Sequence, residues 1–176
     1  MLEITIPKQE YFDESCGEFV YIPEQHLTLE HSLVSLSKWE SKWHKPFLQE
    51  KSKTIEESLD YIRCMTINKN VNPLAYRGIT PALFKQINDY IDAPMTATWF
   101  SKEQSKGSKS EVVTSELIYY WMIALQIPVE FEKWHLNRLI TLIKVCNIKN
   151  APPKKMSRRE IMERNRRLNS ARKKKP

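Results

Sequence analysis

The segment VVTSELIYYWMIALQ, residues 112–126, decides the fold class of this chain. It is apolar on nearly every side, which is typical of a central buried helix. The apolar stretch 117–129 contains Gln126 and Pro128 and is about 13 residues long, whereas a membrane span needs roughly 20. Ile127 and Pro128 break the helix, and a proline can open the next one. We therefore expect an αα-hairpin within a predominantly helical body.

Helical periodicity extends to both sides of this segment. After Pro128, a core-facing stripe is formed by Trp134, Leu136, Leu139, Ile140 and Ile143. Before the segment, apolar residues three and four positions apart predict a helix that ends near Pro46, with the face Leu36, Trp39, Trp43 and Phe47.

Capping signals mark the starts of two more helices. Residues 54–57 form a capping box, which opens a helix that runs to about Met65 or Ile67. Residues 80–81, a threonine followed by a proline, start another helix that should end before Pro94. Two stretches rich in polar and turn-forming residues are predicted to be loops, 68–76 and 101–110.

The first 30 residues have the pattern of β-strands. Apolar residues alternate with polar ones in two places, at Leu2, Ile4 and Ile6 and again at Leu27 and Leu29. Residues 19–22 are β-branched or aromatic, and 13–17 form a turn-rich stretch before them. We expect a small antiparallel sheet of two or three strands. Only three glycines occur, which favours helices over a β-rich fold. The predicted fold class is α+β, predominantly α-helical, with an N-terminal antiparallel β element, a helical bundle and a basic C-terminal arm.

Positive charge is concentrated at the C-terminus. The chain has 28 Lys and Arg against 21 Asp and Glu, a net charge of +7, but residues 151–176 alone hold eleven of the basic residues and two of the acidic ones. We divide the chain into a β element at 1–30, a helical body at 31–150 that forms one globular domain with it, and a basic arm at 151–176. A capping box at 157–160 predicts a helix in the arm, with few apolar residues on one side. We expect this helix to be only marginally stable until it binds a partner.

No residue pattern indicates catalysis or metal binding. The histidines His26, His31, His44 and His135 lack the spacing of a metal site. Three cysteines are widely spaced, which favours a reducing cytoplasm over a disulfide framework: Cys16, Cys64 and Cys146. There is no glycine-rich phosphate loop and no N-terminal signal-peptide pattern. We expect a protein that is not an enzyme and has no cofactor, metal site or membrane contact.

Two groups of residues are candidates for partner binding. The tryptophans Trp39, Trp43 and Trp134 could be helix-packing residues or exposed anchors for a partner protein. The arm offers the cations Lys154, Lys155, Arg158, Arg159, Arg166 and Arg167. They could neutralise nucleic-acid phosphates, capture an acidic or amphipathic partner, or simply be solvated. The arm lacks interleaved aromatics for base stacking, so nucleic acid is the less favoured partner.

Six segments, nearly from end to end, resemble a family from long-tailed siphophages, the tail assembly chaperones. They are LEHSLVSLSKWESKWHKPF (29–47), DYIRCMT (60–66), YIDAPMTATWF (90–100), TSELIYYWMIA (114–124), KWHLNRLITLIKVCNIKN (133–150) and PPKKMS (152–157).

The resemblance implies a chaperone that binds the tape-measure protein in the host bacterial cytoplasm, promotes assembly of the tail tube around it, and is absent from the mature virion. It implies the tape-measure and tail-tube proteins as partners, with self-association left open, and it carries no catalytic or binding residues over to this chain. Many members have a longer form made by ribosomal frameshifting, and the codons of Lys173–Lys175 are a candidate slippery site. The alternatives are a nucleic-acid-binding phage protein that acts through its basic tail and a structural tail component.

Overall fold

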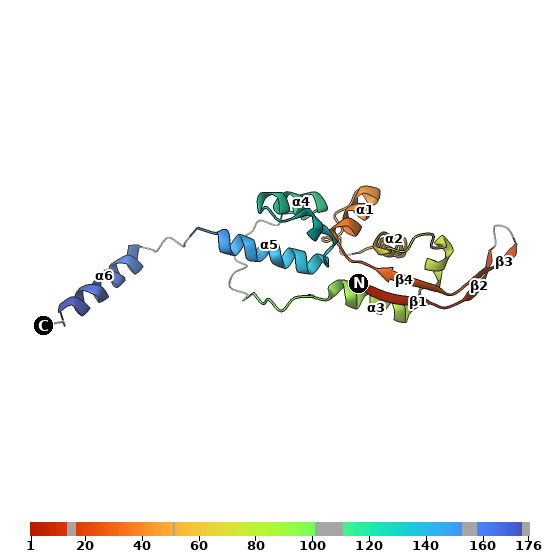
Figure 1. Cartoon of the computed structure of the whole chain (residues 1–176), viewed down its shortest axis with the longest axis horizontal. Coiled ribbons are helices and arrows are strands. Elements are labelled where there is room, and N and C mark those ends of the chain that lie inside the picture. Colours follow the sequence, from red (N-terminus) through yellow and green to blue (C-terminus); the bar gives the residue numbers. More distant parts are fainter. Residues whose placement is uncertain (14–16, 51, 101–110, 153–157, 174–176) are drawn as a thin grey trace. The chain divides into compact units, whose positions relative to one another are not determined.

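The computed structural model describes residues 1–13, 17–50, 52–100, 111–152 and 158–173, and its elements confirm the predominantly helical α+β fold. The chain divides into two compact units, Met1–Cys146 and Asn147–Pro176. Figure 1 shows the first unit as an antiparallel β-ribbon against which the helices pack. In the part of the chain that is described, no helix is long and apolar enough to cross a membrane. The predicted loop at 101–110 lies outside the described residues.

The β element is one long hairpin made of two strand pairs. Strand β1 (Leu2–Ile6) pairs with β4 (Gln25–Leu29), and β2 (Gln9–Asp13) pairs with β3 (Glu18–Ile22). The register is unchanged across the break, because Ile6 faces Gln25 and Gln9 faces Ile22. Pro7 and Pro23 lie at the break and have no N–H to donate to the ladder.

The prediction of two or three strands was therefore incomplete. It missed β2, whose polar residues hide the strand pattern. Figure 1 shows β2 and β3 continuing beyond β1 and β4, away from the helices.

The capping signals fix three helix starts. Helix α1 (Leu33–Trp43) begins at a capping box formed by Ser32 and Ser35, and α2 (Ile55–Met65) begins at the predicted box formed by Thr54 and Glu57. Helix α3 (Pro81–Asp92) has the predicted cap and N-terminal proline, and it ends before Pro94. The 3₁₀ helix η1 (Pro73–Gly78) occupies part of a predicted loop.

Helix α1 ends three residues earlier than predicted. His44 takes a left-handed conformation, with φ of 53°, and its N–H donates to the carbonyl of Glu40. Phe47 therefore follows the helix instead of continuing its face, although its side chain is still buried.

Helices α4 (Ser115–Ala124) and α5 (Leu136–Asn150) differ from the predicted αα-hairpin. A 3₁₀ helix, η3 (Val129–Lys133), lies between them where an αα-hairpin would have a short loop. Pro128 therefore precedes η3, and Trp134 lies outside α5. Helix α4 packs against α1.

One hydrophobic core joins the base of the hairpin to the helices. From the strands it takes Ile4, Ile6, Leu27 and Leu29, all nearly inaccessible to solvent. From the helices it takes, among others, Leu33, Leu36, Trp39, Tyr61, Ile62, Met65, Ile87, Ile118, Met122, Leu136, Leu139 and Ile143. Of the stripe predicted after Pro128, Leu136, Leu139 and Ile143 are buried, whereas Ile140 and Trp134 are half-buried.

The arm contains helix α6 (Arg158–Lys173). Residues 158–170 are all exposed, including the apolar side chains Ile161, Met162 and Leu168. Ser157, the predicted cap, lies outside the described residues, as do Lys154 and Lys155.

Candidate interaction surfaces

Trp39 is a core residue, so the prediction that it anchors a partner is wrong. Its side chain is completely buried, and its indole N–H donates to the carbonyl of Glu57 at 2.9 Å. The ring of Phe47 meets it edge-on at 5.0 Å between centroids. The helical spacing places Trp39 on the inner face of α1, where α2 covers it.

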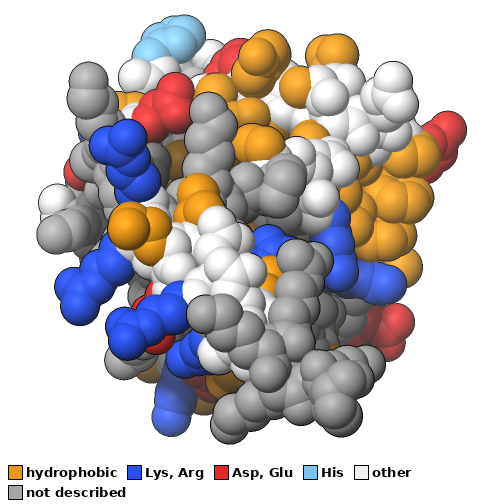
Figure 2. Space-filling model, turned by 90° about the vertical axis from the view of Figure 1, so that its left-hand side faces the viewer, with side chains coloured by type: hydrophobic (Ala, Val, Ile, Leu, Met, Phe, Trp, Pro, Cys, Tyr) orange, Lys and Arg blue, Asp and Glu red, His pale blue; other side chains and the backbone are white. Residues whose placement is uncertain are grey.

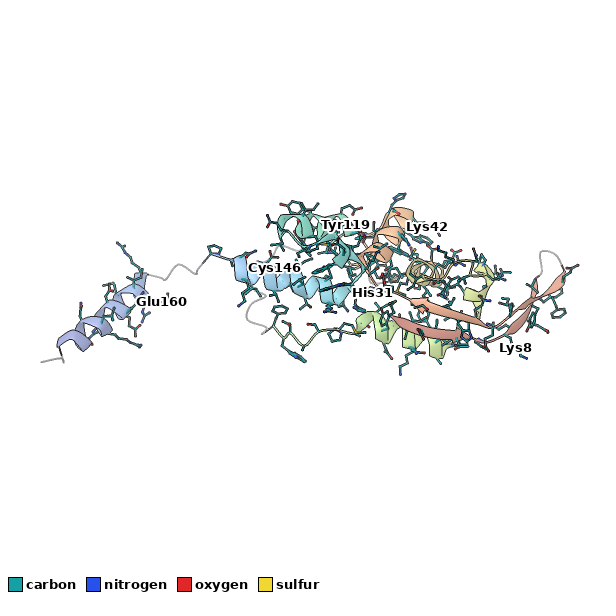
Figure 3. All side chains as sticks on the ribbon, in the orientation of Figure 1. Lys8, His31, Lys42, Tyr119, Cys146 and Glu160 are labelled. Carbon is teal, nitrogen blue, oxygen red and sulfur yellow. The ribbon has the colours of Figure 1, made fainter. Side chains whose placement is uncertain are left out.

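Trp43 is half-buried and belongs to the same α1–α2 contact. Its indole N–H donates to the carboxylate of Asp60 at 2.9 Å, and the Lys42 ammonium reaches the other oxygen of that carboxylate at 2.5 Å. Figure 3 labels Lys42 on α1. Two of the three tryptophan candidates therefore hold two helices together.

A second ion pair reinforces this contact. The Lys45 ammonium lies 2.6 Å from the carboxylate of Glu57. The hydrogen bond from Lys45, together with the N–H of Thr54, lowers the pKa of Glu57 below its ordinary value. The pair fixes the segment after α1 to the start of α2.

Trp134 remains partly accessible. Its ring stacks on Phe131 at 4.0 Å between centroids, and the Arg138 guanidinium lies over it at 4.1 Å. Unlike Trp39 and Trp43, Trp134 contacts residues of η3 and of the first turn of α5.

Helix α4 presents a second apolar face to solvent. Its buried face consists of Ser115, Ile118 and Met122, which are three and four residues apart. Its outer face consists of Glu116, Tyr120, Ile123 and Ala124, and 63% of Tyr120 and 75% of Ile123 are exposed. The expectation that this helix is buried on all sides is wrong, because neighbouring elements cover one face only. No signal in the sequence placed this helix where only one face is covered, so the exposure of Tyr120 and Ile123 could not be predicted from residues 112–126.

The outer part of the hairpin also carries exposed aromatic side chains. Phe12 and Phe19 face each other across β2 and β3, and their rings meet at 5.2 Å between centroids. Tyr21 lies on the same face, and all three are more than half exposed. Sequence reasoning missed this surface. Both alternating positions of residues 19–22 are apolar or aromatic, and a two-stranded ribbon has no partner for its second face.

The arm surface is helix α6, on which the four described candidates are exposed: Arg158, Arg159, Arg166 and Arg167. Arg167 reaches Glu163 at 3.3 Å, one turn away. Figure 2 shows Lys and Arg side chains in blue, with hydrophobic side chains in orange among them. A net positive helix with a few apolar side chains is suited to a partner that is acidic and partly apolar.

The buried histidine His31 lies among aromatic side chains in the interior of the first unit (Figure 3). Burial, aided by the neighbouring His135 ring, lowers the pKa of His31 to about 3. Burial raises the pKa of Tyr61, and a hydrogen bond of 2.6 Å joins its hydroxyl group to Nδ1 of His31. His135 donates from Nε2 to the carbonyl of Tyr90 at 2.9 Å. The cluster joins the start of α5 to the end of β4.

The remaining histidines and cysteines do not form a cluster with these groups. His26 and His44 are exposed, and Cys64 and Cys146 are half-buried against the core. Within the described ranges, no group of three His, Cys, Asp or Glu side chains could hold a metal ion. Cys16 lies outside those ranges.

No protein-family model matches this chain, and no curated protein or solved structure is significantly similar to it.

Proposed function

We propose that this protein is a non-enzymatic phage tail assembly chaperone. In this proposal it binds the tape-measure protein in the host bacterial cytoplasm, promotes assembly of the tail tube, and is absent from the mature virion. The proposal rests on the six segments of sequence resemblance given above, which lie between residues 29 and 157 and together cover 72 of the 176 residues.

One observation carries the proposal beyond the resemblance, namely the outer face of α4. Ile123 and Ala124 lie three and four residues after Tyr120, about one turn further along a well-formed helix. Such a row packs into the groove of another helix, because residues three and four apart form the ridges of helix–helix contacts. A tape measure is a long helical protein whose apolar side chains must be covered before assembly. The face of α4 offers cover of that kind.

The arm supplies the second part of the proposal. Its positive charge steers an acidic partner toward the chaperone and raises the rate of encounter. We assign it to contact with the tape measure or to recruitment of the tail-tube protein. Deletion of residues 151–176 should weaken pull-down of at least one of these partners at moderate salt. Unchanged pull-down of both would remove the arm from the proposal.

The test of the α4 face is co-expression with the tape-measure protein. The native chain should keep the tape measure in the supernatant. The double variant Tyr120→Ser, Ile123→Ser should weaken binding on the order of 30- to 1000-fold, because each exposed apolar side chain contributes about 1–2 kcal/mol when a partner covers it. The matched control is Ile55→Ser, which removes an apolar side chain that is 81% exposed at the start of α2.

Retention of full solubilising activity by the α4 double variant, with its fold intact by circular dichroism, would exclude this face as the binding site. A native chain that fails to solubilise the tape measure would contradict the proposed function itself.

The exposed arginines of α6 make nucleic-acid binding the second candidate function. An electrophoretic shift with duplex and single-stranded nucleic acid would test it, and non-specific binding should fall steeply as salt rises. Shifts that persist at physiological salt would favour this candidate over the chaperone. The third candidate, a structural tail component, requires the protein in purified virions, where mass spectrometry would find it.

A further inference from the structure

The β-hairpin is the acidic part of the chain. Residues 1–30 contain seven Asp and Glu and a single Lys, whereas residues 151–176 contain eleven Lys and Arg and two acids. The charge of the chain is therefore divided between its two ends. Four of the hairpin glutamates are exposed: Glu3, Glu10, Glu18 and Glu24. Among the described residues, neither Glu10 nor Glu18 has an ion-pair partner.

One of these glutamates lies on the aromatic face of β2 and β3. Glu10 is paired with Tyr21, and Phe12 with Phe19, so their side chains project from the same side of the ribbon. Glu18 is paired with Asp13 and alternates with Phe19, so it projects from the opposite side of the ribbon. The aromatic face therefore combines the Glu10 carboxylate with the exposed rings of Phe12, Phe19 and Tyr21.

Helix α6 has the complementary chemistry. Arg158, Arg159 and Arg166 form no ion pair with another described residue. Ile161, Met162 and Leu168 are each between 44% and 71% exposed. Arginine pairs with carboxylates and stacks on aromatic rings, and the apolar side chains of such a helix need a partner surface.

We propose that the β2–β3 face of one copy binds helix α6 of a second copy. The arginines of α6 would pair with Glu10, and its apolar side chains would cover Phe12 and Phe19. Glu18, on the other side of the same ribbon, would add to the attraction without lying under the helix. Charge complementarity between two surfaces of the same chain selects this occupant. The inference does not depend on the tape measure, because it concerns the isolated protein.

The geometry of this contact has a consequence for the size of the assembly. The hairpin and the arm are different surfaces, so the contact is heterologous and leaves one hairpin and one arm unoccupied at the ends of each open assembly. Association should therefore continue beyond the dimer as concentration rises. Because exposed ion pairs contribute little individually and are screened by salt, the contact should be weak and salt-sensitive.

The test is sedimentation velocity of the full chain over a concentration series at low salt. The native protein should show a mass that rises with concentration, and 0.5 M salt, about a 4 Å Debye length, should reverse the rise. The hairpin variant Glu10→Lys, Glu18→Lys and the arm variant Arg158→Glu, Arg159→Glu, Arg166→Glu should each associate about tenfold more weakly.

The two variants also test each other. Mixed together they should associate, because the arm variant keeps a native hairpin and the hairpin variant keeps a native arm. The matched control, Asp89→Lys with Glu130→Lys, makes the same change in net charge at two exposed acids outside the hairpin and should associate as the native protein does.

Three results would overturn the proposal: a native chain that is monomeric at every concentration, a control that weakens association as much as the hairpin variant does, or a mixture in which the two variants stay separate. The last result includes the case in which the arm binds the hairpin of its own copy. Circular dichroism of each variant would confirm that weaker association is not caused by a failure to fold.

Discussion

The carboxylate of Glu40 joins the end of α1 to the start of α4. One oxygen accepts the backbone N–H of Phe47 at 3.0 Å, and the other accepts the N–H of Ser115 at 2.7 Å. Glu40 is 7% exposed and Ser115 is fully buried. Because Ser115 is the first residue of α4, the carboxylate also lies at the positive end of that helix. The position of the apolar α4 face therefore depends on a residue 75 positions earlier in the chain.

Substitution of Glu40 by glutamine should destabilise the fold. The glutamine amide has a single oxygen, so its NH₂ group would face one of two backbone donors and leave that N–H unsatisfied. We expect a loss of about 2–3 kcal/mol in the free energy of unfolding, measured by urea denaturation. The control Glu130→Gln, at an exposed position on η3, should change it by less than about 0.5 kcal/mol. Equal stability of Glu40→Gln and the native chain would show that the two hydrogen bonds do not hold α4.

The two faces of α4 should respond differently to the same truncation. Ile118 is fully buried, so Ile118→Ala should cost about 2–4 kcal/mol of stability through lost burial and a cavity. Ile123 is 75% exposed, so Ile123→Ala should cost less than about 0.5 kcal/mol. Thermal or urea denaturation of both variants measures the difference. A large loss for Ile123→Ala would mean that the outer face is covered within the folded chain.

Trp39 and Trp134 provide a parallel comparison among the tryptophans. Trp39→Ala should cost about 3–5 kcal/mol, because it empties a core position and leaves the carbonyl of Glu57 without its indole partner. Trp134→Ala should cost less, since that ring is only half-buried. If Trp39→Ala instead left stability unchanged and weakened partner binding, its assignment to the core would be wrong.

The free energy of unfolding should decrease as the pH is lowered, because His31 is buried in its neutral form. The pKa of His31 is about 3 in the folded state and 6.5 in the unfolded state, so the unfolded chain takes up the proton first as the pH falls. The stability that depends on neutral His31 is fully present above about pH 6.5 and is lost progressively as the pH falls toward 3. Between pH 7.5 and pH 5.0 the expected loss is about 2 kcal/mol.

The measurement compares urea denaturation of the native chain with that of His31→Gln at both pH values. The variant should lose less stability on acidification than the native chain by about that amount. Burial also lowers the pKa of His135, so a residual loss of the same sign is expected in the variant. An unaltered pH dependence in His31→Gln would mean that His31 is not the titrating group.

The starts of α2 and α3 could be predicted because their signals are local. The capping box at Thr54 and the proline at Pro81 act on backbone groups within a turn of themselves, so the starts of α2 and α3 follow from a few residues. Strand β2 could not be predicted in the same way. Its polar residues form a strand because β3 pairs with them, and that partner is decided by the hairpin as a whole.

The candidate surfaces could be predicted only in part. The arm was found from charge alone, since a cluster of arginines stays exposed in almost any fold. The sequence could not show which tryptophans are core residues and which are accessible, because Trp39 and Trp134 have the same side chain and differ only in what packs over them. The aromatic face of β2 and β3 was missed because its strand partner was missed.

The sequence by itself determined where α2 and α3 begin, that the chain is mostly helical, and that its positive charge is concentrated in the last 26 residues. Each of these depends on neighbours within about four positions or on composition. Only the tertiary structure decided which apolar side chains are covered. The inner face of α4 lies against α1 and its outer face has no cover among the described elements, and Glu40 holds that arrangement through a bond to Ser115. Burial is a property of segments distant in sequence that come together, so no local pattern could have assigned Ile118 to the core and Ile123 to the surface.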